Sequence, residues 1–289
     1  MPAKNKGRIP GWISLPLTLG AFGALVWLEW RRPLRRSVEP KLTRVARNLA
    51  VAAAGGVALG LAERPVTEPL AQRVERNKLG LLKIRSLPPW VELPLAVVLM
   101  DYTLYLWHYL THRVPLLWRF HVVHHADLDL DVSTALRFHF GELLLSVPWR
   151  AAQVRLVGVS PLALSAWQTL LFVSIMFHHS NVRLPLAVER RLNRFIVTPR
   201  MHGIHHSTVR AETDSNWSSG LTLWDRLHGT LRLDVPQGEI TIGVPAYRRP
   251  DEVTLPRIIG LPFGPQRPAW RLDAPAEKPD TEVQRRQES

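Results

Sequence analysis

The sequence predicts an all-α integral membrane bundle of about four spans, capped on its cytoplasmic side by a histidine-rich helical region. Residues 11–28 and 157–176 carry no charged side chain, and each stretch approaches the roughly 20 residues needed to cross a hydrocarbon core. All 12 histidines lie between His108 and His228. The apolar stretches predict the spans, and the clustered histidines predict the cap.

The remaining helices follow from apolar segments that polar sequence separates. Residues 48–62 are charge-free and rich in Ala and Gly, which favours a short span or a packed membrane helix. Residues 64–87 are polar and basic and precede two prolines, so we expect a connection there and a new helix over 90–112. The turn signal at 158–161 predicts a helical hairpin formed by 143–157 and 162–177.

Three parts of the chain are expected to differ in role. Residues 1–89 hold N-terminal spans and basic loops, and residues 90–233 form the histidine-bearing domain. Residues 234–289 form a C-terminal extension, which we expect to be disordered from about residue 265 because it is charged and Pro-rich. Residues 31–47 follow the first span and carry seven Lys or Arg, which predicts a cytoplasmic loop on the side of the histidines.

Charge and composition exclude several classes of function. The net charge is +13, but the basic residues gather beside the apolar blocks, as expected at an anionic membrane surface. No segment combines basic and aromatic residues as a nucleic-acid groove requires, so we expect no nucleic-acid partner. The chain has no cysteine, which excludes disulfides, thiolate metal sites and iron–sulfur clusters. Richness in Ala, Arg and Pro is compatible with a bacterial inner membrane.

Most histidines occur at helical spacings that place them on one face. His108 and His112 are four residues apart, and the pattern HxxHH occurs twice, over residues 121–125 and 202–206. Residues at i, i+3 and i+4 share a helix face, so their imidazoles can converge on a metal ion. The repetition predicts two comparable half-sites, because nine or ten histidines suit two ions with positions left open.

Residue types alone leave the metal and the function open. Imidazole ligands suit iron, zinc, copper or nickel. A membrane metal-binding protein or transporter would distribute its ligands through several spans, whereas a zinc-dependent membrane hydrolase would use fewer histidines and a carboxylate base. Here the histidines end apolar helices and gather at one membrane surface, where a lipid chain can reach them.

The histidines outside these clusters are expected to have different roles. His139 and His179 are candidate ligands, His178 is expected to face away from the metals, and His228 is expected on the surface. Ligating histidines need acceptors for their second ring nitrogen, and nearby carboxylates are the candidates: Asp101, Asp127, Glu142, Glu212 and Asp214. Trp107, Trp118 and Trp217 flank the clusters and are expected in an interfacial belt, with a wall that lines the lipid chain as the alternative.

These residues resemble a known family. The segments DYTLYLWHYLTH, LWRFHVVHHAD, STALRFHFGE, FHHSNVRLP, TPRMHGIHHS and LWDRLHGT are similar, in order, to motifs of the fatty acid hydroxylase and sterol desaturase superfamily of integral membrane di-iron enzymes. The resemblance covers about residues 90–233, and the departures from the common motifs remove no histidine. The resemblance implies metal ligation by His108, His112, His121, His124, His125, His179, His202, His205 and His206, with His139 as a tenth.

The resemblance also implies the chemistry. Two non-haem irons would use dioxygen to hydroxylate or desaturate a lipid such as a fatty acyl chain or a sterol. The sequence contains no flavin, dinucleotide or haem motif. Electrons are therefore expected from NAD(P)H through a separate redox protein, either a ferredoxin or a small cytochrome, and the basic surface would suit an acidic one.

Overall fold

The described part of the chain, residues 7–267 of a computed structural model, is helical and contains no β-strand. The predicted all-α fold is therefore confirmed, whereas most of the predicted disordered tail lies outside the described residues. The main helices are α1 (Gly11–Arg31), α2 (Lys41–Ala58), α3 (Arg64–Asn77), α4 (Pro89–Arg113), α5 (Pro115–His125), α6 (Phe140–Val157) and α7 (Pro161–His179). Five short helices follow: α8 (Leu186–Leu192), α9 (Pro199–His205), α10 (Arg210–Thr213), α11 (Leu223–Leu227) and α12 (Leu255–Gly260).

Four helical stretches are long and apolar enough to cross a membrane, as the sequence predicts. They are Gly11–Arg31, Lys41–Lys83, Pro89–Arg113 and Pro161–His179. The first packs along α7 but exposes large apolar side chains such as Trp12, Leu19 and Trp30. A helix that is apolar around most of its surface and little buried by protein suits a hydrocarbon environment.

The second stretch differs from the prediction for residues 64–87. The helix does not stop after α2 but continues through a π-helical segment, Leu59–Glu63, into α3, and it ends where Lys78 adopts a left-handed conformation. Thr67, Ala71 and Val74 are buried at helical spacing, so a packed stripe holds α3 in place despite its charged composition. The prediction of a connection is therefore wrong for Arg64–Asn77. The sequence does not reveal this helix because its apolar stripe is short and the residues around the stripe are polar.

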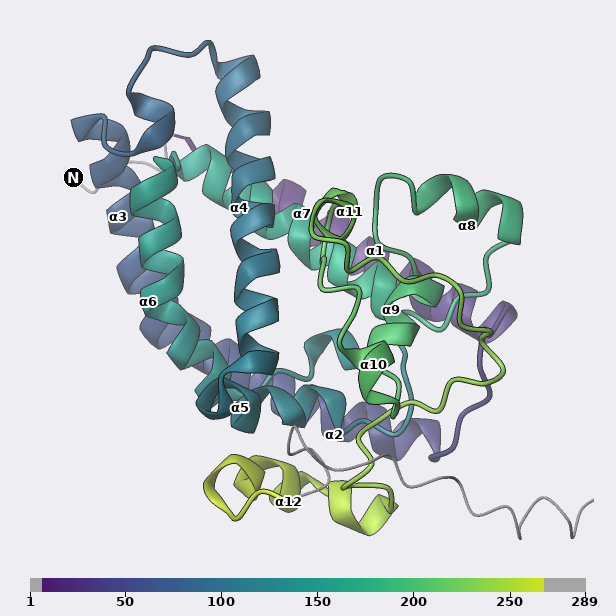
Figure 1. The fold of residues 1–289 in the computed structure, drawn as a ribbon. Helices are drawn as coiled ribbons and strands as arrows, with labels where there is room; N and C mark the ends of the chain where they lie inside the picture. The colour runs from purple at the N-terminus through teal and green to yellow at the C-terminus, as the bar shows by residue number, and fades with distance from the viewer. Residues whose placement is uncertain (1–6, 268–289) are drawn as a thin grey trace, which may run out of the picture.

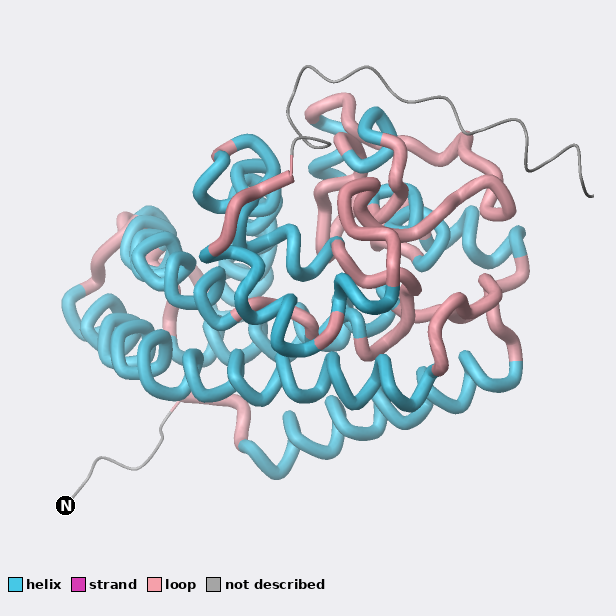
Figure 2. Tube along the Cα trace, turned by 90° about the horizontal axis from the view of Figure 1, so that it is seen from below, coloured by secondary structure: helices cyan, strands magenta, loops and turns pink. Residues whose placement is uncertain are grey.

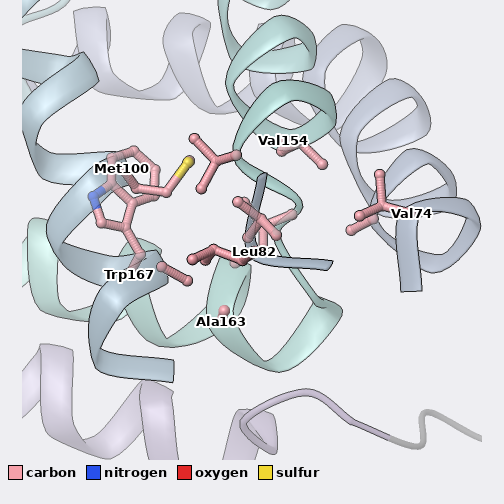
Figure 3. Close-up of a cluster of buried hydrophobic side chains, with 11 residues drawn as sticks. Val74, Leu82, Met100, Val154, Ala163 and Trp167 are labelled. Atoms are coloured by element: carbon pink, nitrogen blue, oxygen red, sulfur yellow. The ribbon is translucent and has the colours of Figure 1, made fainter. Parts of the chain in front are cut away.

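The predicted hairpin of α6 and α7 is confirmed. Gly158 ends α6 with a φ of 88°, and the Ser160 hydroxyl accepts a hydrogen bond from the Ala163 amide at the start of α7. Gly80 packs so closely against Gly158 that a Cβ there would meet its backbone. Figure 3 shows the core that this arrangement encloses, in which Met100 of α4 and Trp167 of α7 pack near Val154 of α6.

The short helices lie at one side of the bundle. In Figure 1, α8 to α11 stand beside α4 and α7, away from α3, and α12 lies below α2 and α5. Figure 2 shows the long helices running together while most loops gather on the other side. Helix α5 contacts the span α4, and α9 contacts the span α7. Each of these two spans is therefore in contact with a helix that carries an HxxHH motif or part of one.

A buried ionic network ties α2 to the chain that follows α5. Arg44 donates to Asp127 at 2.8 Å and pairs with Asp131, and the Asn48 amide donates to Asp127 at 2.9 Å. Arg137 donates to the Asn48 side chain at 2.8 Å and to the carbonyl of Val123 within α5. The network therefore fixes the position of α5.

The ionisation of Asp127 links this network to pH. Burial alone would raise the pKa of Asp127, but the guanidiniums of Arg44, Arg137 and Arg47 outweigh burial and hold that pKa below its ordinary value of 3.8. A carboxyl group whose pKa is lower in the folded state than in the unfolded chain stabilises the fold. This stabilisation is complete when the pH is above the unfolded-state pKa, and it is lost as the pH falls through the folded-state pKa. Acid is therefore expected to loosen the attachment of α2 to α5.

We expect Asp127→Asn to lower the stability of the detergent-purified protein by about 3 kcal/mol, because the change removes a buried counter-charge that Arg44, Arg47 and Arg137 share. Tryptophan fluorescence during heating measures the effect. The matched control is Asp251→Asn, because Asp251 pairs with Arg249 on the surface and is half-exposed. Equal unfolding midpoints for the two variants would contradict a stabilising role for the network.

Candidate metal centre

Four helices bring eight histidines into two groups of four. The first histidine group contains His108, His112, His125 and His205, and the second contains His124, His179, His202 and His206. Within each group the candidate ligand atoms all lie within 4.8 Å of one another. The span ends of α4 and α7 contribute three of these side chains, and α5 and the α9 region contribute the other five.

The repeated HxxHH motif explains how one segment serves two groups. Adjacent helical residues are about 100° apart around the axis, so neighbouring histidines point in different directions. In α5, His124 joins the second group and His125 the first. At the end of α9, His205 joins the first group and His206 the second. Each HxxHH motif therefore has one pair of adjacent histidines, and the pair contributes one histidine to each group.

The second histidine group has the donor arrangement of a cation site. Nε2 of His179 lies 3.0 Å from Nε2 of His124 and 3.0 Å from Nε2 of His202, and Nε2 of His206 lies 3.1 Å from that of His202. Four imidazole nitrogens that converge in this way suit a shared positive ion better than they suit one another, because at most one nitrogen of each pair can donate. The chemistry of the donors fits zinc or iron.

The first histidine group also has the donor arrangement of a cation site. Nδ1–H of His108 donates to the Trp217 carbonyl at 2.7 Å, and Nδ1–H of His205 donates to the Ser215 carbonyl at 2.8 Å. These bonds select the tautomer that leaves Nε2 as a lone-pair donor. Nε2 of His112, His125 and His205 is buried without a hydrogen-bond partner among the described residues, and a metal ion would satisfy all three.

Burial keeps these side chains neutral, as a ligand must be. Burial lowers the pKa of His205 to about 3 and lowers that of His124, His125, His202 and His206 well below the ordinary value of 6.5. Neighbouring histidines add to the effect, since two imidazolium charges so close together would repel. At neutral pH the groups therefore present lone pairs rather than positive charge.

His121 lies between the groups without belonging to either. Its ring centroid is 4.8 Å from that of His112 and 5.4 Å from that of His124. Nδ1–H donates to Glu142 at 2.8 Å, and the buried Nε2 has no partner among the described residues. Glu142 therefore orients His121, as carboxylates orient ligating histidines in metal sites. Of the five carboxylates predicted for this role, Glu142 is the one hydrogen-bonded to a histidine of the clusters.

His139 does not join the clusters, although the sequence made it a candidate ligand. Its Nδ1 accepts a hydrogen bond from the Gly141 amide at 3.0 Å, and its Nε2 lies 3.2 Å from the Ile259 carbonyl oxygen. Both ring nitrogens are therefore engaged, and the side chain acts as the N-cap of α6. The motif RFHFGE thus contributes a structural histidine, and its Glu142 contributes to the site.

Two other residues correct the expectations from the sequence. His178 does not face away: it is buried, and its ring centroid lies 4.1 Å from that of His202. Trp217 is fully buried, with its ring centroid 4.5 Å from that of His112, so it packs on the site instead of forming a belt. Trp107 lines the adjoining cavity, in agreement with the alternative of a chain-lining wall. His228 is exposed, as expected.

A cavity of about 620 Å³ opens onto the histidines. His108, His124, His179 and His202 line one end, and apolar side chains of α4, α6 and α7 line most of its length. The volume lies within the range of sites that enclose small organic ligands. The arrangement therefore offers a water-poor channel through which an apolar chain can reach both groups.

Comparison with known proteins agrees with this geometry. Residues 93–230 match the fatty acid hydroxylase family model. This segment, which contains both histidine groups, is therefore similar to the fatty acid hydroxylase family. No solved structure gives a significant match.

Curated proteins similar to this chain include an ornithine lipid hydroxylase of Rhizobium tropici, 32% identical over 54% of this chain and 46% of the relative. Human alkylglycerol monooxygenase is 30% identical over 47% of this chain and 29% of the relative. Mouse cholesterol 25-hydroxylase is 27% identical over 48% of this chain and 46% of the relative. The matches thus span less than half the length of these relatives.

We expect the purified protein to hold about two metal ions per chain, and we expect His112→Ala or His202→Ala to remove about one each, because each change disrupts one group. Elemental analysis after gel filtration measures the ratio. His228→Gln is the control, because His228 is exposed and outside both groups. Equal metal content in all four proteins would contradict the assignment of separate groups.

His139→Asn is expected to keep both metal ions and most of the stability, because Asn is also a strong N-cap residue. His139→Ala is expected to keep the metals but to lose about 1 kcal/mol of stability. Metal analysis and thermal unfolding of the same preparations test both statements. Loss of a full equivalent of metal in His139→Asn would make His139 a ligand after all.

Proposed function

We propose that this protein is a membrane-bound non-haem di-iron oxygenase that hydroxylates or desaturates a lipid, using dioxygen and electrons supplied from outside. One observation carries the proposal: two buried four-histidine groups lie at the end of an apolar cavity among candidate membrane spans. The family match and the lipid hydroxylases among the curated relatives support it.

Each part of the chain would contribute a defined role. The two histidine groups would hold the irons, which supply oxygen activation and abstraction of hydrogen from an unactivated C–H bond. Glu142 would orient His121, and the carbonyls of Trp217 and Ser215 would orient His108 and His205. The cavity would exclude water and align the lipid chain, and its alignment would decide between hydroxylation and desaturation.

A separate electron donor would dock near the short helices. Arg190, Arg191 and Arg194 are exposed on or just after α8, and α9 with its histidines follows directly in the chain. A basic surface of this kind would steer an acidic ferredoxin or small cytochrome that NAD(P)H reduces through its reductase. We place this surface and the histidines at the cytoplasmic face of a bacterial inner membrane, where such donors are present.

The function is tested with iron-loaded protein in lipid nanodiscs, supplied with NADPH, a ferredoxin reductase and ferredoxin. We expect lipid products that gain one oxygen from isotopically labelled dioxygen, or that lose two hydrogens. The His124→Ala, His205→Ala double variant should lose all turnover, because it disrupts both groups. Formation of a lipid product by the zinc-loaded protein without dioxygen would instead indicate a hydrolase. Metal uptake into liposomes that contain the protein would indicate a transporter.

Replacing Arg190 and Arg191 by Glu should lower the rate about tenfold at low salt when an acidic ferredoxin limits turnover, because the reversed charges repel it. The difference should shrink at high salt. Arg249→Glu is the control, since Arg249 is exposed on a different segment. Identical rates and identical salt dependence would place the donor elsewhere.

A further inference from the structure

The end of the cavity remote from the histidines is lined by charged side chains that the chemistry at the metals does not use. Glu63 and Arg150 line it, and they are 7% and 8% exposed. Arg150 lies on α6, which packs against α2, α3 and α4 of the candidate spans. Ionisable residues buried in a membrane bundle are unfavourable unless they serve a function or a partner stabilises them.

Helix α6 connects the two ends of the cavity. Glu142, Ser146 and Arg150 are spaced four residues apart and line the cavity from the same helix face. Glu142 contacts His121, so Arg150 stands two turns away, about 12 Å along the helix axis. One continuous helix therefore sets the separation between the histidines and the charged end.

The opposite wall is shaped by the π-helical segment Leu59–Glu63. Leu59, Glu63 and Arg64 line the cavity, and Glu63 is the last residue of the segment. π-helical turns are rare, and those inside α-helices frequently lie at functional sites. Here the turn lies where the Glu63 carboxylate meets Arg150.

Arg150 is held in place but incompletely paired. Its Nη1 donates to Gln153 at 2.6 Å, and its guanidinium lies 4.3 Å from the centroid of the Trp167 ring. Its Nε is buried without a hydrogen-bond partner among the described residues. The nearest Glu63 oxygen is 4.0 Å from that Nε, which is too far for a hydrogen bond.

One chemical group can form hydrogen bonds to both Arg150 and Glu63. A hydroxyl oxygen placed about 2.8 Å from each atom would accept from Arg150 and donate to Glu63, and it would bridge their separation. An anion would gain from Arg150 but would be repelled by Glu63. An ether oxygen would accept from Arg150 and leave Glu63 unmatched. Arg8 and Arg64 also line the cavity, but Arg8 pairs with Glu68 at 2.6 Å and Arg64 is exposed. The buried pair of Glu63 and Arg150 is neutral overall and therefore suits a neutral donor and acceptor.

We propose that Glu63 and Arg150 bind the hydroxyl group of a neutral, hydroxyl-bearing lipid whose chain extends along the cavity to the histidines. The proposal rests on the proposed lipid oxygenase function for its meaning as a substrate site. The bound hydroxyl fixes how far the chain reaches past Glu142, so the carbon presented to the metals is counted from the hydroxyl end.

The first test measures binding without turnover. Metal-loaded protein in detergent is titrated with tritiated hexadecanol in a scintillation proximity assay, with methyl hexadecyl ether, hexadecane and palmitate as competitors. We expect hexadecanol to bind about tenfold more tightly than the ether and more tightly than palmitate, because only the alcohol makes both bonds. Equal affinity for alcohol, ether and hexadecane, or a preference for palmitate, would overturn the proposal.

The second test uses a variant that leaves no isolated charge. The double variant Glu63→Gln, Arg150→Gln should reduce the preference for hexadecanol over the ether to nearly none. Glu75→Gln, Lys78→Gln is the matched control, because this helical ion pair lies outside the cavity. If the cavity variant unfolds, the discrimination among probes by the wild-type protein decides alone. An unchanged preference in a folded variant would mean that the pair binds only water.

Product analysis separates this site from the proposed function. With tetradecanol, hexadecanol and octadecanol as substrates, the oxidised carbon should stay at the same number of bonds from the hydroxyl. A position counted from the methyl end would overturn the anchoring site while leaving the oxygenase intact. Alcohol-selective binding without any oxidised product would leave the binding site standing and would reject the oxygenase.

Discussion

The close packing of many imidazoles in a dry interior is the constraint on which this structure depends. Buried polar nitrogens are costly when they lack partners, and several nitrogens of the two histidine groups have none among the described residues. A cation in each group would turn that cost into favourable ligation. The ends of α4 and α7, together with α5 and the α9 region, must therefore meet at one place.

The polar groups around the histidines serve that requirement at two levels. Backbone carbonyls and Glu142 set ring orientation, and the network around Asp127 sets the position of α5 as a whole. Glu29 of α1 extends the attachment, because its carboxylate accepts from the amides of Val132 and Asn181. The first span is thereby fastened to the loops that surround the site, although little of its surface is buried in protein.

Much of this architecture could be predicted from the sequence, because it depends on periodic patterns and on single turn-forming residues. Apolar stretches predicted the spans, and Gly158 with Pro161 predicted the hairpin. Helical spacing placed His108 with His112 and His202 with His206, but it did not predict that His124 and His125 join different groups. Long-range contacts left no such signal. His139 and His179 both lie outside the HxxHH motifs, yet one caps α6 and the other joins a group, because position relative to a distant helix decides the role. The buried face of α3 was hidden among charged residues for the same reason.

The two ends of the cavity are linked by one helix, and this has consequences for selectivity. A change that shifts α6 along its axis moves Glu142 and Arg150 together, so the orientation of His121 and the proposed anchoring of the lipid would change together. The π-helical segment lines the cavity with Leu59 and Glu63, and neither residue contacts a histidine of the two groups through a hydrogen bond. A substitution at Leu59 or Glu63 would therefore act first on the remote end of the cavity. Such a division between the two ends would allow one metal-binding scaffold to serve lipids of different length.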